Sequence, residues 1–431
     1  MAIFMGPNQA KLNGHKGLTK HAELVRIEAS EKVYIPLVNM GSTTFEVHVK
    51  EGDYVQIGTK LATRNDNFIV PVYSSVSGVV GKVVNVMHSA LKPMPHLEIF
   101  NDGKNEQIRS FEPIDYEQAS REELIAFTKD AGIVGCGGAG FPTYFKYQTA
   151  KNVDSLLING VECEPYITAD YASMLKYTKE LVVGAKMMQK MAAAKEAVIA
   201  IKAYNTDVIA KVREQLQKET NIRVVEVPDA YPMGWERTLI FQVFGKRYDR
   251  LPGEIGIVVN NSATAIAVAR AALEGTPIVE KIVTFSGDGL KKPSNVVVPV
   301  GVPVAEVVKK LGGYATEDVL LIAGGPMMGK TIVNDQFVIT SYTNAITILE
   351  TTPIDDVACL RCGRCTDHCP AYIQPVRIMQ AEKAQSIEAM MAQDVMKCIE
   401  CGLCTYVCPS KLEVTESVRR AKRRVQAFTT K

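Results

Sequence analysis

The sequence predicts a multidomain α+β protein that ends in a small cysteine-rich helical domain. Three observations support this: the length, the changing pattern along the chain and the placement of the cysteines. At about 150 residues per domain, 431 residues make roughly three domains. Short β-like runs give way to strands alternating with helices, and eight of the 10 cysteines lie between Cys359 and Cys408. A secreted disulfide scaffold is small and spreads its cysteines, so a metal or cluster site is the first hypothesis.

Composition and charge exclude some classes of function. Charged residues make up 22% and apolar residues 47%, and 49 Lys and Arg face 47 Asp and Glu, for a net charge of +2. A dedicated nucleic-acid binder usually has a strong basic excess, so we expect no nucleic-acid partner. We find neither a signal-peptide pattern nor a run of about 18 uncharged apolar residues. We therefore expect a cytoplasmic protein that reaches a membrane only through partners.

Residues 33–100 predict small strands joined by tight turns, because Val, Ile and Gly recur there in short alternating runs. The segments 49–58 and 72–80 together resemble the two halves of the barrel-sandwich hybrid of biotinyl and lipoyl carrier domains. Those carriers expose a Lys at the hairpin between the halves. This chain has Ser75-Val76-Ser77-Gly78 there, so we expect a structural β-domain without covalent biotin or lipoate.

The next part of the chain predicts βαβ units and a largely parallel sheet. Ser120, with Glu123 three residues on, predicts the N-cap of a helix within 115–128. Strands are expected at 155–160, 197–203, 224–228 and 256–260, and helices at 170–194, 205–219 and 262–274. From 278 to 313 the β pattern returns, with strands at 282–287 and 294–300 and a short helix within 302–313.

Two copies of the spacing C-x2-C-x2-C-x3-C-P follow, which is the spacing of two-cluster ferredoxins. Thiolates match Fe–S clusters, and spacings of two residues let one loop hold three corners of a cubane. The proline turns the chain away after the fourth cysteine, which then reaches the other cluster. Zinc prefers a single set of four ligands. We therefore expect two [4Fe–4S] clusters, one held by Cys359, Cys362, Cys365 and Cys408 and the other by Cys398, Cys401, Cys404 and Cys369.

A glycine-rich loop at 135–140 precedes Lys146. Four glycines in six residues let the backbone approach a ligand closely, and exposed N–H groups suit a phosphate. Taken alone this is a modest signal, because many such loops are only tight turns. Three further segments make the signal more specific. They are 159–166 (NGVECEPY), 231–236 (YPMGWE) and 259–264 (VNNSAT).

This series of motifs resembles the FMN- and NADH-binding 51 kDa subunit of respiratory complex I. It is still more similar to the RnfC family, the peripheral subunits of Rnf ion-translocating ferredoxin:NAD oxidoreductases. The second likeness covers nearly the whole chain, including the carrier-like β-domain, GGPMMG at 324–329 and both cysteine motifs. It implies four parts: a barrel-sandwich hybrid domain (1–112), a Rossmann-like FMN/NADH domain (113–276), a ubiquitin-like SLBB module (277–350) and a two-cluster ferredoxin domain (351–431).

The resemblance also implies roles for single residues. Those expected to border the FMN phosphate and ring are Gly135, Gly137, Gly138 and Lys146. Asn159 and Glu162 would hold the flavin, and Glu164 and Glu236 would lie near the nicotinamide nucleotide, where they would disfavour a 2′-phosphate. The residues expected to complete the flavin pocket are Tyr231, Gly234, Asn260, Asn261 and Thr264.

The function implied by the resemblance is that of an NADH-dependent oxidoreductase and peripheral electron-transfer subunit. It would exchange electrons between NAD(H), FMN and two [4Fe–4S] clusters in an Rnf-type complex at the cytoplasmic face of the membrane. Expected partners are membrane and iron–sulfur subunits and ferredoxin or another redox protein. Two alternatives stay open: a stand-alone RnfC-like reductase serving a proline reductase or cobalamin reductase system, and a non-enzymatic assembly adaptor.

The C-terminal segment 417–431 is basic, with five Lys and Arg between Arg419 and Arg424. This pattern predicts either a solvated helix end or a docking patch for an acidic partner or anionic lipid headgroups.

Overall fold

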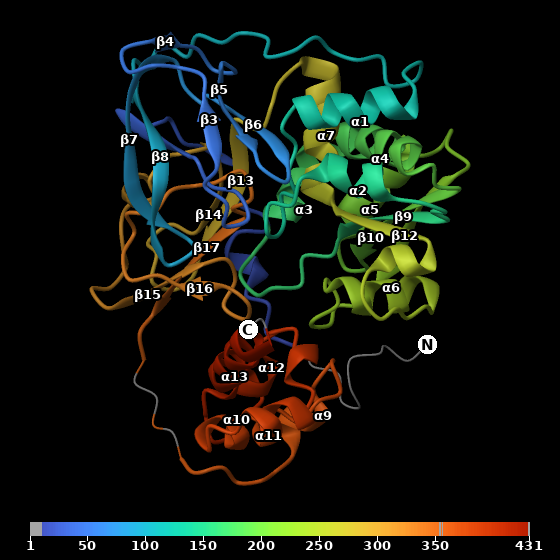
Figure 1. The fold of residues 1–431 in the computed structure, drawn as a ribbon, viewed down its shortest axis with the longest axis vertical. Coiled ribbons are helices and arrows are strands. Elements are labelled where there is room, and N and C mark those ends of the chain that lie inside the picture. Colours follow the sequence, from blue (N-terminus) through green and yellow to red (C-terminus); the bar gives the residue numbers. More distant parts are fainter. Residues whose placement is uncertain (1–10, 353–354, 356, 430–431) are drawn as a thin grey trace.

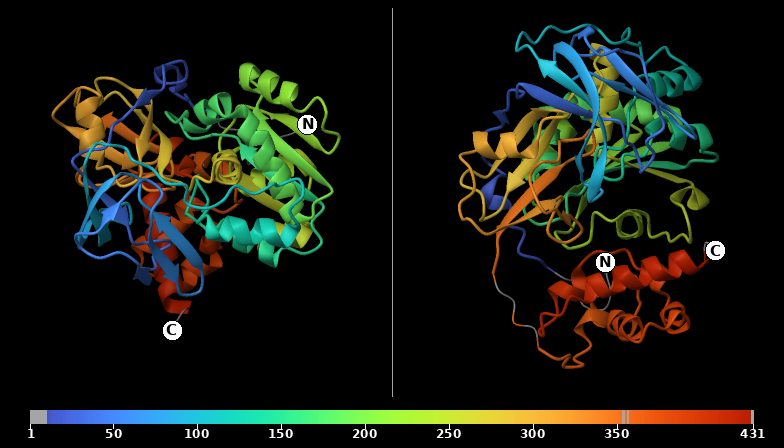
Figure 2. Two further views of the ribbon diagram at one scale, coloured as in Figure 1. Left: turned by 90° about the horizontal axis from the view of Figure 1, so that it is seen from above. Right: turned by 60° about the vertical axis from the view of Figure 1, so that its left-hand side comes forward.

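The C-terminal helices form a lobe of their own beneath the rest of the molecule (Figure 1). The computed structural model describes residues 11–352, 355 and 357–429. Above the helical lobe, β-rich and α/β regions stand side by side, and the right-hand view of Figure 2 shows the same separation of the lobes. The predicted multidomain α+β organisation is confirmed. Among the described helices, none combines the length and apolar character that a membrane span requires.

The first β-domain consists of two antiparallel sheets. One has the order β2-β8-β7-β4 and the other β3-β5-β6. Their bounds are β2 (Lys32–Pro36), β3 (Phe45–Val47), β4 (Tyr54–Val55), β5 (Lys60–Asn65), β6 (Ile69–Tyr73), β7 (Gly78–His88) and β8 (Lys92–Asn101). The turn between β6 and β7 is buried, with Ser75 and Ser77 at most 4% exposed and Gly78 pressed against the carbonyl of Phe100. Because this turn is buried, it exposes no side chain to which a mobile prosthetic group could be attached.

The α/β domain is built on a parallel sheet of order β11-β10-β9-β12. Its strands are β9 (Ser155–Gly160), β10 (Glu196–Lys202), β11 (Ile222–Val227) and β12 (Ile257–Asn261). The helices are α1 (Arg121–Asp130), α2 (Thr143–Thr149), α3 (Ala169–Lys176), α4 (Thr178–Ala192), α5 (Thr206–Gln215), α6 (Glu236–Phe244) and α7 (Ser262–Glu274). The predicted capping box of Ser120 and Glu123 starts α1, where it satisfies two of the free donors of the first turn.

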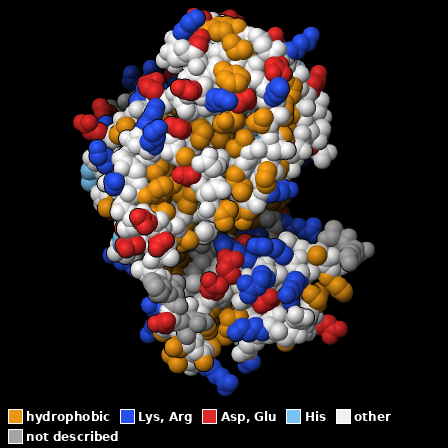
Figure 3. Space-filling model, turned by 90° about the vertical axis from the view of Figure 1, so that its left-hand side faces the viewer, with side chains coloured by type: hydrophobic (Ala, Val, Ile, Leu, Met, Phe, Trp, Pro, Cys, Tyr) orange, Lys and Arg blue, Asp and Glu red, His pale blue; other side chains and the backbone are white. Residues whose placement is uncertain are grey.

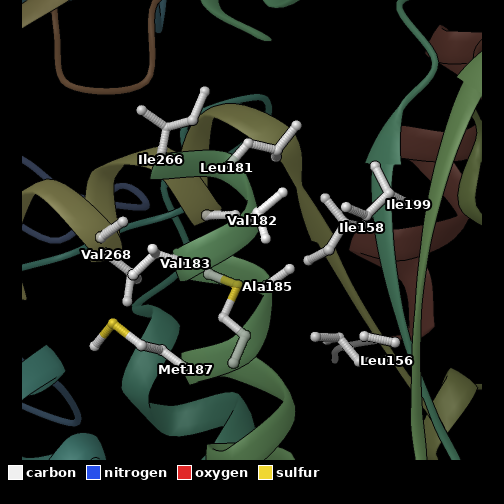
Figure 4. Close-up of a cluster of buried hydrophobic side chains, with 14 of the residues drawn as sticks. Leu156, Ile158, Leu181, Val182, Val183, Ala185, Met187, Ile199, Ile266 and Val268 are labelled. Carbon is white, nitrogen blue, oxygen red and sulfur yellow. The ribbon is translucent and has the colours of Figure 1, made fainter. Parts of the chain in front are cut away.

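Apolar side chains of α4 and α7 fill the space against β9 and β10 (Figure 4). Gly184 lets α4 and α7 approach, since a methyl group there would lie 1.9 Å from the carbonyl oxygen of Ala265. The single helix expected over 170–194 is wrong. Tyr177 leaves the helical conformation (φ −116°, ψ 45°) where its ring meets the Arg270 guanidinium at 5.3 Å, and this divides the segment into α3 and α4.

The third region is a six-stranded sheet of order β1-β14-β13-β17-β15-β16. Its elements are β1 (Val25–Arg26), β13 (Glu280–Ser286), β14 (Ser294–Pro299), α8 (Val304–Lys310), β15 (Val319–Ala323), β16 (Lys330–Thr331) and β17 (Ala345–Glu350). β1 comes from the N-terminal part of the chain and pairs with β14. One hydrophobic core joins this sheet to the first β-domain, with Ile35 and Leu97 in the same cluster as Phe285 and Val298. The boundaries at 112, 276 and 350 stay predictions, but the first and third regions pack as one body.

The helical lobe repeats one local structure twice. It contains α9 (Arg364–Asp367), α10 (Pro375–Lys383), α11 (Ile387–Ala392), α12 (Leu403–Tyr406) and α13 (Val414–Thr429). Gly363 (φ +79°) and Gly402 (φ +80°) occupy equivalent positions in the two cysteine runs, just before α9 and α12. Both need a left-handed conformation that glycine adopts without strain. Apolar side chains of α10, α11 and α13 form the core of the lobe.

Candidate functional site

The residues expected to bind a nucleotide lie at the carboxyl edge of the parallel sheet. Asn159 is near the end of β9, and Asn260 and Asn261 end the neighbouring strand β12. The chain leaves β9 toward β10 on one side and has β12 on the other, and ligands of such sheets bind where the strand order reverses in this way. The glycine loop reaches the same edge, since a methyl group on Gly137 would lie 2.7 Å from the Asn261 side-chain nitrogen.

Lys146 supports the end of β12 from helix α2. Its ammonium donates to the carbonyl of Val259 at 2.8 Å and lies 3.4 Å from the side-chain oxygen of Asn260. Burial lowers the pKa of Lys146, while the negative charge of Glu236 opposes that shift. The lysine is therefore a buried cation directly beneath the predicted ligand edge.

Two hydrogen bonds connect the predicted site segments, and a third closes the turn after β9. The Asn159 amide donates to the carbonyl of Gly234 at 2.9 Å, and its oxygen accepts from the Val161 N–H. The hydroxyl oxygen of Thr264 accepts from the backbone N–H of Cys136 at 3.0 Å, which fastens the glycine loop to α7. The structure thus brings the glycine loop, β9, β12 and the 231–236 segment to one place.

Glu162 is buried together with a lysine from the start of the chain. Its carboxylate accepts from the Asp170 N–H at 2.9 Å and lies 3.9 Å from the Lys16 ammonium, which donates to the backbone carbonyls of Glu162 and Ile167. Burial raises the pKa of Glu162 to about 7, although the charge of Lys16 opposes this, and burial lowers the pKa of Lys16. Sequence reasoning missed Lys16, whose only local signal is its place between Gly14 and Gly17.

The remaining predicted residues make contacts away from the glycine loop. Both carboxylate oxygens of Glu164 accept backbone N–H groups, from Met327 at 3.1 Å and Met328 at 2.8 Å. Burial raises the pKa of Glu164 to about 7 even though these two N–H groups oppose the shift. Tyr231 donates its hydroxyl to the carbonyl of Cys401 at 2.6 Å. Glu236, the first residue of α6, accepts the hydroxyl of Tyr248 at 2.7 Å.

The eight clustered cysteines fall into two spatial sets of four. A cavity of about 590 Å³ is lined by the first set, Cys359, Cys362, Cys365 and Cys408. A smaller cavity of about 20 Å³ is lined by the second set, Cys369, Cys398, Cys401 and Cys404. Each set takes three cysteines from one run and the fourth from the other.

The donor chemistry of both sets suits clusters better than single ions. Within the described residues, no three His, Cys, Asp or Glu side chains come close enough to hold one metal ion. A cubane places its four thiolates at separated corners, so wider spacing fits it. Burial raises the pKa values of the Cys401 and Cys404 thiols, and bound iron is the charge that overcomes such a penalty.

The basic C-terminal helix is largely paired within the lobe. Arg420 and Arg424 reach Glu382, while Arg419 and Lys422 reach Glu400. Arg423 remains exposed. Figure 3 shows many Lys and Arg side chains on this lobe, interspersed with acidic ones. Four of the five cations are therefore paired within the lobe, while Arg423 and about half of the Arg420 and Arg424 side chains remain exposed.

A separate group of arginines surrounds the first cysteine set. Arg361, Arg364 and Arg377 line its cavity with exposed side chains. They form no salt bridge within the part of the chain that the structure describes. Leu360, between Cys359 and Arg361, is 64% exposed. The rim thus carries three arginines and one exposed carboxylate, that of Asp367, together with the exposed apolar side chain of Leu360.

Comparison with protein families matches four segments of the chain. Residues 8–104 match the "RnfC Barrel sandwich hybrid domain", and residues 128–270 match the "Nuo51 FMN-binding domain". Residues 282–331 match the "SLBB domain", and residues 352–409 match the "4Fe-4S dicluster domain".

Whole-chain relatives are similar over most of their length, and three of them are the corresponding subunits of ion-translocating complexes. One belongs to the Na(+)-translocating ferredoxin:NAD(+) oxidoreductase complex of Acetobacterium woodii and is 33% identical over 92% of this chain and 91% of the relative. Another, from the proton-translocating ferredoxin:NAD(+) oxidoreductase complex of Clostridium ljungdahlii, is also 33% identical, over 80% and 77%. A third, from the ion-translocating oxidoreductase complex of Rhodobacter capsulatus, is 33% identical over 87% and 74%. Among solved structures, a chain of an NAD+-reducing [NiFe]-hydrogenase has 19% identity and a TM-score of 0.49, covering 72% of this chain and 62% of that one.

Proposed function

Since this chain belongs to the RnfC family, whose members are subunits of ion-translocating ferredoxin:NAD(+) oxidoreductase complexes, we propose that it is the subunit where NAD(H) exchanges electrons with two iron–sulfur clusters. It is an oxidoreductase with FMN, NAD(H) and [4Fe–4S] clusters as cofactors. One observation carries the proposal: the nucleotide edge of the sheet and the second cysteine set belong to one chain, and the Tyr231–Cys401 hydrogen bond joins them.

The residues at the sheet edge fit a flavin nucleotide. Bound FMN couples two-electron hydride chemistry to one-electron carriers. We assign the glycine loop with Gly135, Gly137 and Gly138 to its phosphate, because a backbone without Cβ groups offers N–H donors at close range. Lys146 supplies positive charge beneath that edge, and Asn159 orients the turn after β9. Lys16 with Glu162 closes the same turn, with the ammonium donating to the carbonyls of Glu162 and Ile167.

The remaining predicted residues have less direct support. Gly234 adjoins Asn159 through its carbonyl, and Asn260, Asn261 and Thr264 anchor the strand end and the loop. We keep them as flavin-pocket residues and Glu236 as the acidic residue toward the nucleotide. The two cysteine sets are assigned to two [4Fe–4S] clusters, with Cys369 and Cys408 exchanged between the runs.

We further propose that the first cysteine set faces the redox partner. The exposed Arg361, Arg364 and Arg377 suit an acidic one-electron carrier, because complementary charge speeds the encounter. Association with a membrane would then come through such partner proteins. The named relatives are all parts of multi-subunit complexes, which gives no support to a stand-alone reductase.

Anaerobic reconstitution followed by an NADH titration tests the function. We expect flavin absorbance, about eight irons per chain, and bleaching of the flavin by NADH in stopped flow. Flavin and iron without bleaching would indicate an assembly adaptor instead. A chain that takes up neither cofactor would rule out the proposal altogether.

A further inference from the structure

The second cysteine loop is packed onto the α/β domain, although it belongs to the helical lobe. Tyr231, Cys401 and Leu403 are at most 8% exposed and form a small apolar cluster with Met327 and Cys163. The hydroxyl of Tyr231 donates to the Cys401 carbonyl at 2.6 Å. The contact therefore joins the end of the nucleotide site to a predicted cluster ligand.

The 324–329 loop, which belongs to the third region, also takes part in the contact between the second cysteine loop and the α/β domain. Its two N–H groups at Met327 and Met328 are held by the buried carboxylate of Glu164. Gly325 permits the approach, because a methyl group there would lie 2.3 Å from a Glu164 oxygen. On the opposite side, a methyl group on Gly402 would lie 2.6 Å from the carbonyl oxygen of Met327. Glu164, the 324–329 loop and Gly402 are thus stacked in close contact.

The first cysteine loop has no such contact. Gly363 is the counterpart of Gly402, and a methyl group on it would meet no described atom within 4 Å. Cys359 and Cys362 are exposed, whereas Cys401 is buried. The two runs have the same spacing and the same local backbone, so the difference lies in what the rest of the chain builds against the second one.

We propose that Tyr231, Glu164 and the 324–329 loop form a docking seat, which fixes the second cysteine loop against the domain that carries the NAD(H) site. The second cluster is then the one that exchanges electrons with that site, and the first cluster lies beyond it toward the partner. In this scheme Glu164 is a positioning residue, because backbone N–H groups occupy both of its oxygens. This inference rests on the proposed function.

The redox balance is simple. Oxidation of one NADH to NAD+ and a proton would supply two electrons, one for each cluster that the two cysteine sets would hold. Both electrons would pass the second cysteine loop first, because Gly402 in that loop lies against Met327, whereas its counterpart Gly363 has no described atom against it. The rate of electron tunnelling falls steeply with distance. A small displacement of the second cysteine loop should therefore slow electron transfer through the seat but leave hydride transfer unchanged.

A matched pair of glycine variants tests the seat in the reconstituted holoprotein. Gly402→Ala and Gly363→Ala impose the same left-handed strain on equivalent loops, but only Gly402→Ala pushes against Met327. Stopped-flow bleaching by NADH reports the step before the seat, and freeze-quench EPR reports cluster reduction after it. We expect bleaching to be unchanged in both variants and cluster reduction to slow roughly tenfold or more in Gly402→Ala alone.

Met327→Ala, which removes an apolar side chain of the seat, provides a second test that does not change the cluster loops themselves. A docking role predicts an unchanged KM for NADH and slower cluster reduction. A nucleotide-contact role predicts a raised KM and slower bleaching with normal transfer afterwards, which would overturn the proposal. Equal transfer rates in Gly402→Ala and Gly363→Ala, at equal iron content, would overturn it too. Failure of the function itself is distinct, because the unmodified protein would then show no bleaching.

Discussion

At the scale of single residues, charged side chains come together at the turn after β9, where they are largely shielded from water. Glu162, Glu164 and Lys16 are all partly buried, and each has partners that only the fold supplies. The resemblance of the 159–166 segment to the FMN- and NADH-binding subunit of complex I makes Glu162 and Glu164 functional candidates. Their different contacts, one with Lys16 and one with the 324–329 loop, depend on segments far away along the chain.

Lys16→Met should destabilise the protein by about 3 kcal/mol, because it leaves the Glu162 carboxylate buried without its counter-charge. Thermal unfolding of the reconstituted protein measures this, with Lys11→Met as control, since Lys11 is exposed. Equal melting temperatures for the two variants would show that the buried pair contributes nothing.

Glu164 should make stability depend on pH. Its folded pKa of about 7 lies above its ordinary value of 4.5, so the folded state binds the proton more tightly. This contribution is complete below pH 4.5 and is lost as pH rises through 7. When the pH rises from about 5.5 to about 8, the free energy of unfolding should therefore fall less in Glu164→Gln than in the unmodified protein. We expect the two decreases to differ by about 1–3 kcal/mol. Parallel pH profiles of the melting temperature would contradict this.

At the scale of elements, α13 shows how context changes the meaning of a basic segment. From sequence, its five cations suggest a free surface. In the fold, Glu382 on α10 and Glu400 in the second cysteine loop take four of them, so the helix braces the lobe. Similarly, the break at Tyr177 and the pairing of β1 with β14 follow from tertiary packing and not from local propensity.

Glu382→Gln should loosen the brace between α10 and α13. Its carboxylate is 7% exposed, while Arg420 and Arg424 are half exposed, so we expect a loss of about 1–2 kcal/mol. Loss of iron from the holoprotein in mild denaturant reports this locally. Glu388→Gln, an exposed position in α11, is the matched control and should behave like the unmodified protein.

At the scale of the whole molecule, the two lobes have different sources of stability. The upper lobe has large apolar cores, whereas the helical lobe has a smaller one beside a cavity of about 590 Å³ lined by thiols. Metal binding of this kind contributes directly to folding. Cluster occupancy should therefore decide whether the helical lobe stays folded.

Removing the iron with a chelator under air should expose the helical lobe to trypsin while the rest resists. Mass spectrometry should find cleavage first within residues 357–429 and a large fragment ending near residue 350. Simultaneous digestion of both lobes would contradict separate stability. The holoprotein under anaerobic conditions serves as the control.

Electron exchange with an acidic [4Fe–4S] ferredoxin should depend on the first cysteine rim. Replacing Arg361, Arg364 and Arg377 together by Gln should lower the second-order rate about tenfold at low salt and flatten its salt dependence. The same three positions changed to Lys keep the charge and should retain most of the rate. Equal losses in both triple variants would show that charge is not what the rim supplies.

The sequence by itself determined the chemistry of this protein and most of its elements. Cysteine spacing, the glycine loop and the strand–helix alternation act over short stretches, so the two cluster motifs and the strand at 155–160 could be predicted from local pattern. Only the tertiary structure decided that Lys16 neutralises Glu162, that Glu164 holds the 324–329 loop, and that one of two equal cysteine loops is docked. Those contacts join segments that are far apart along the chain, and burial, which gives them their strength, exists only once the chain has folded.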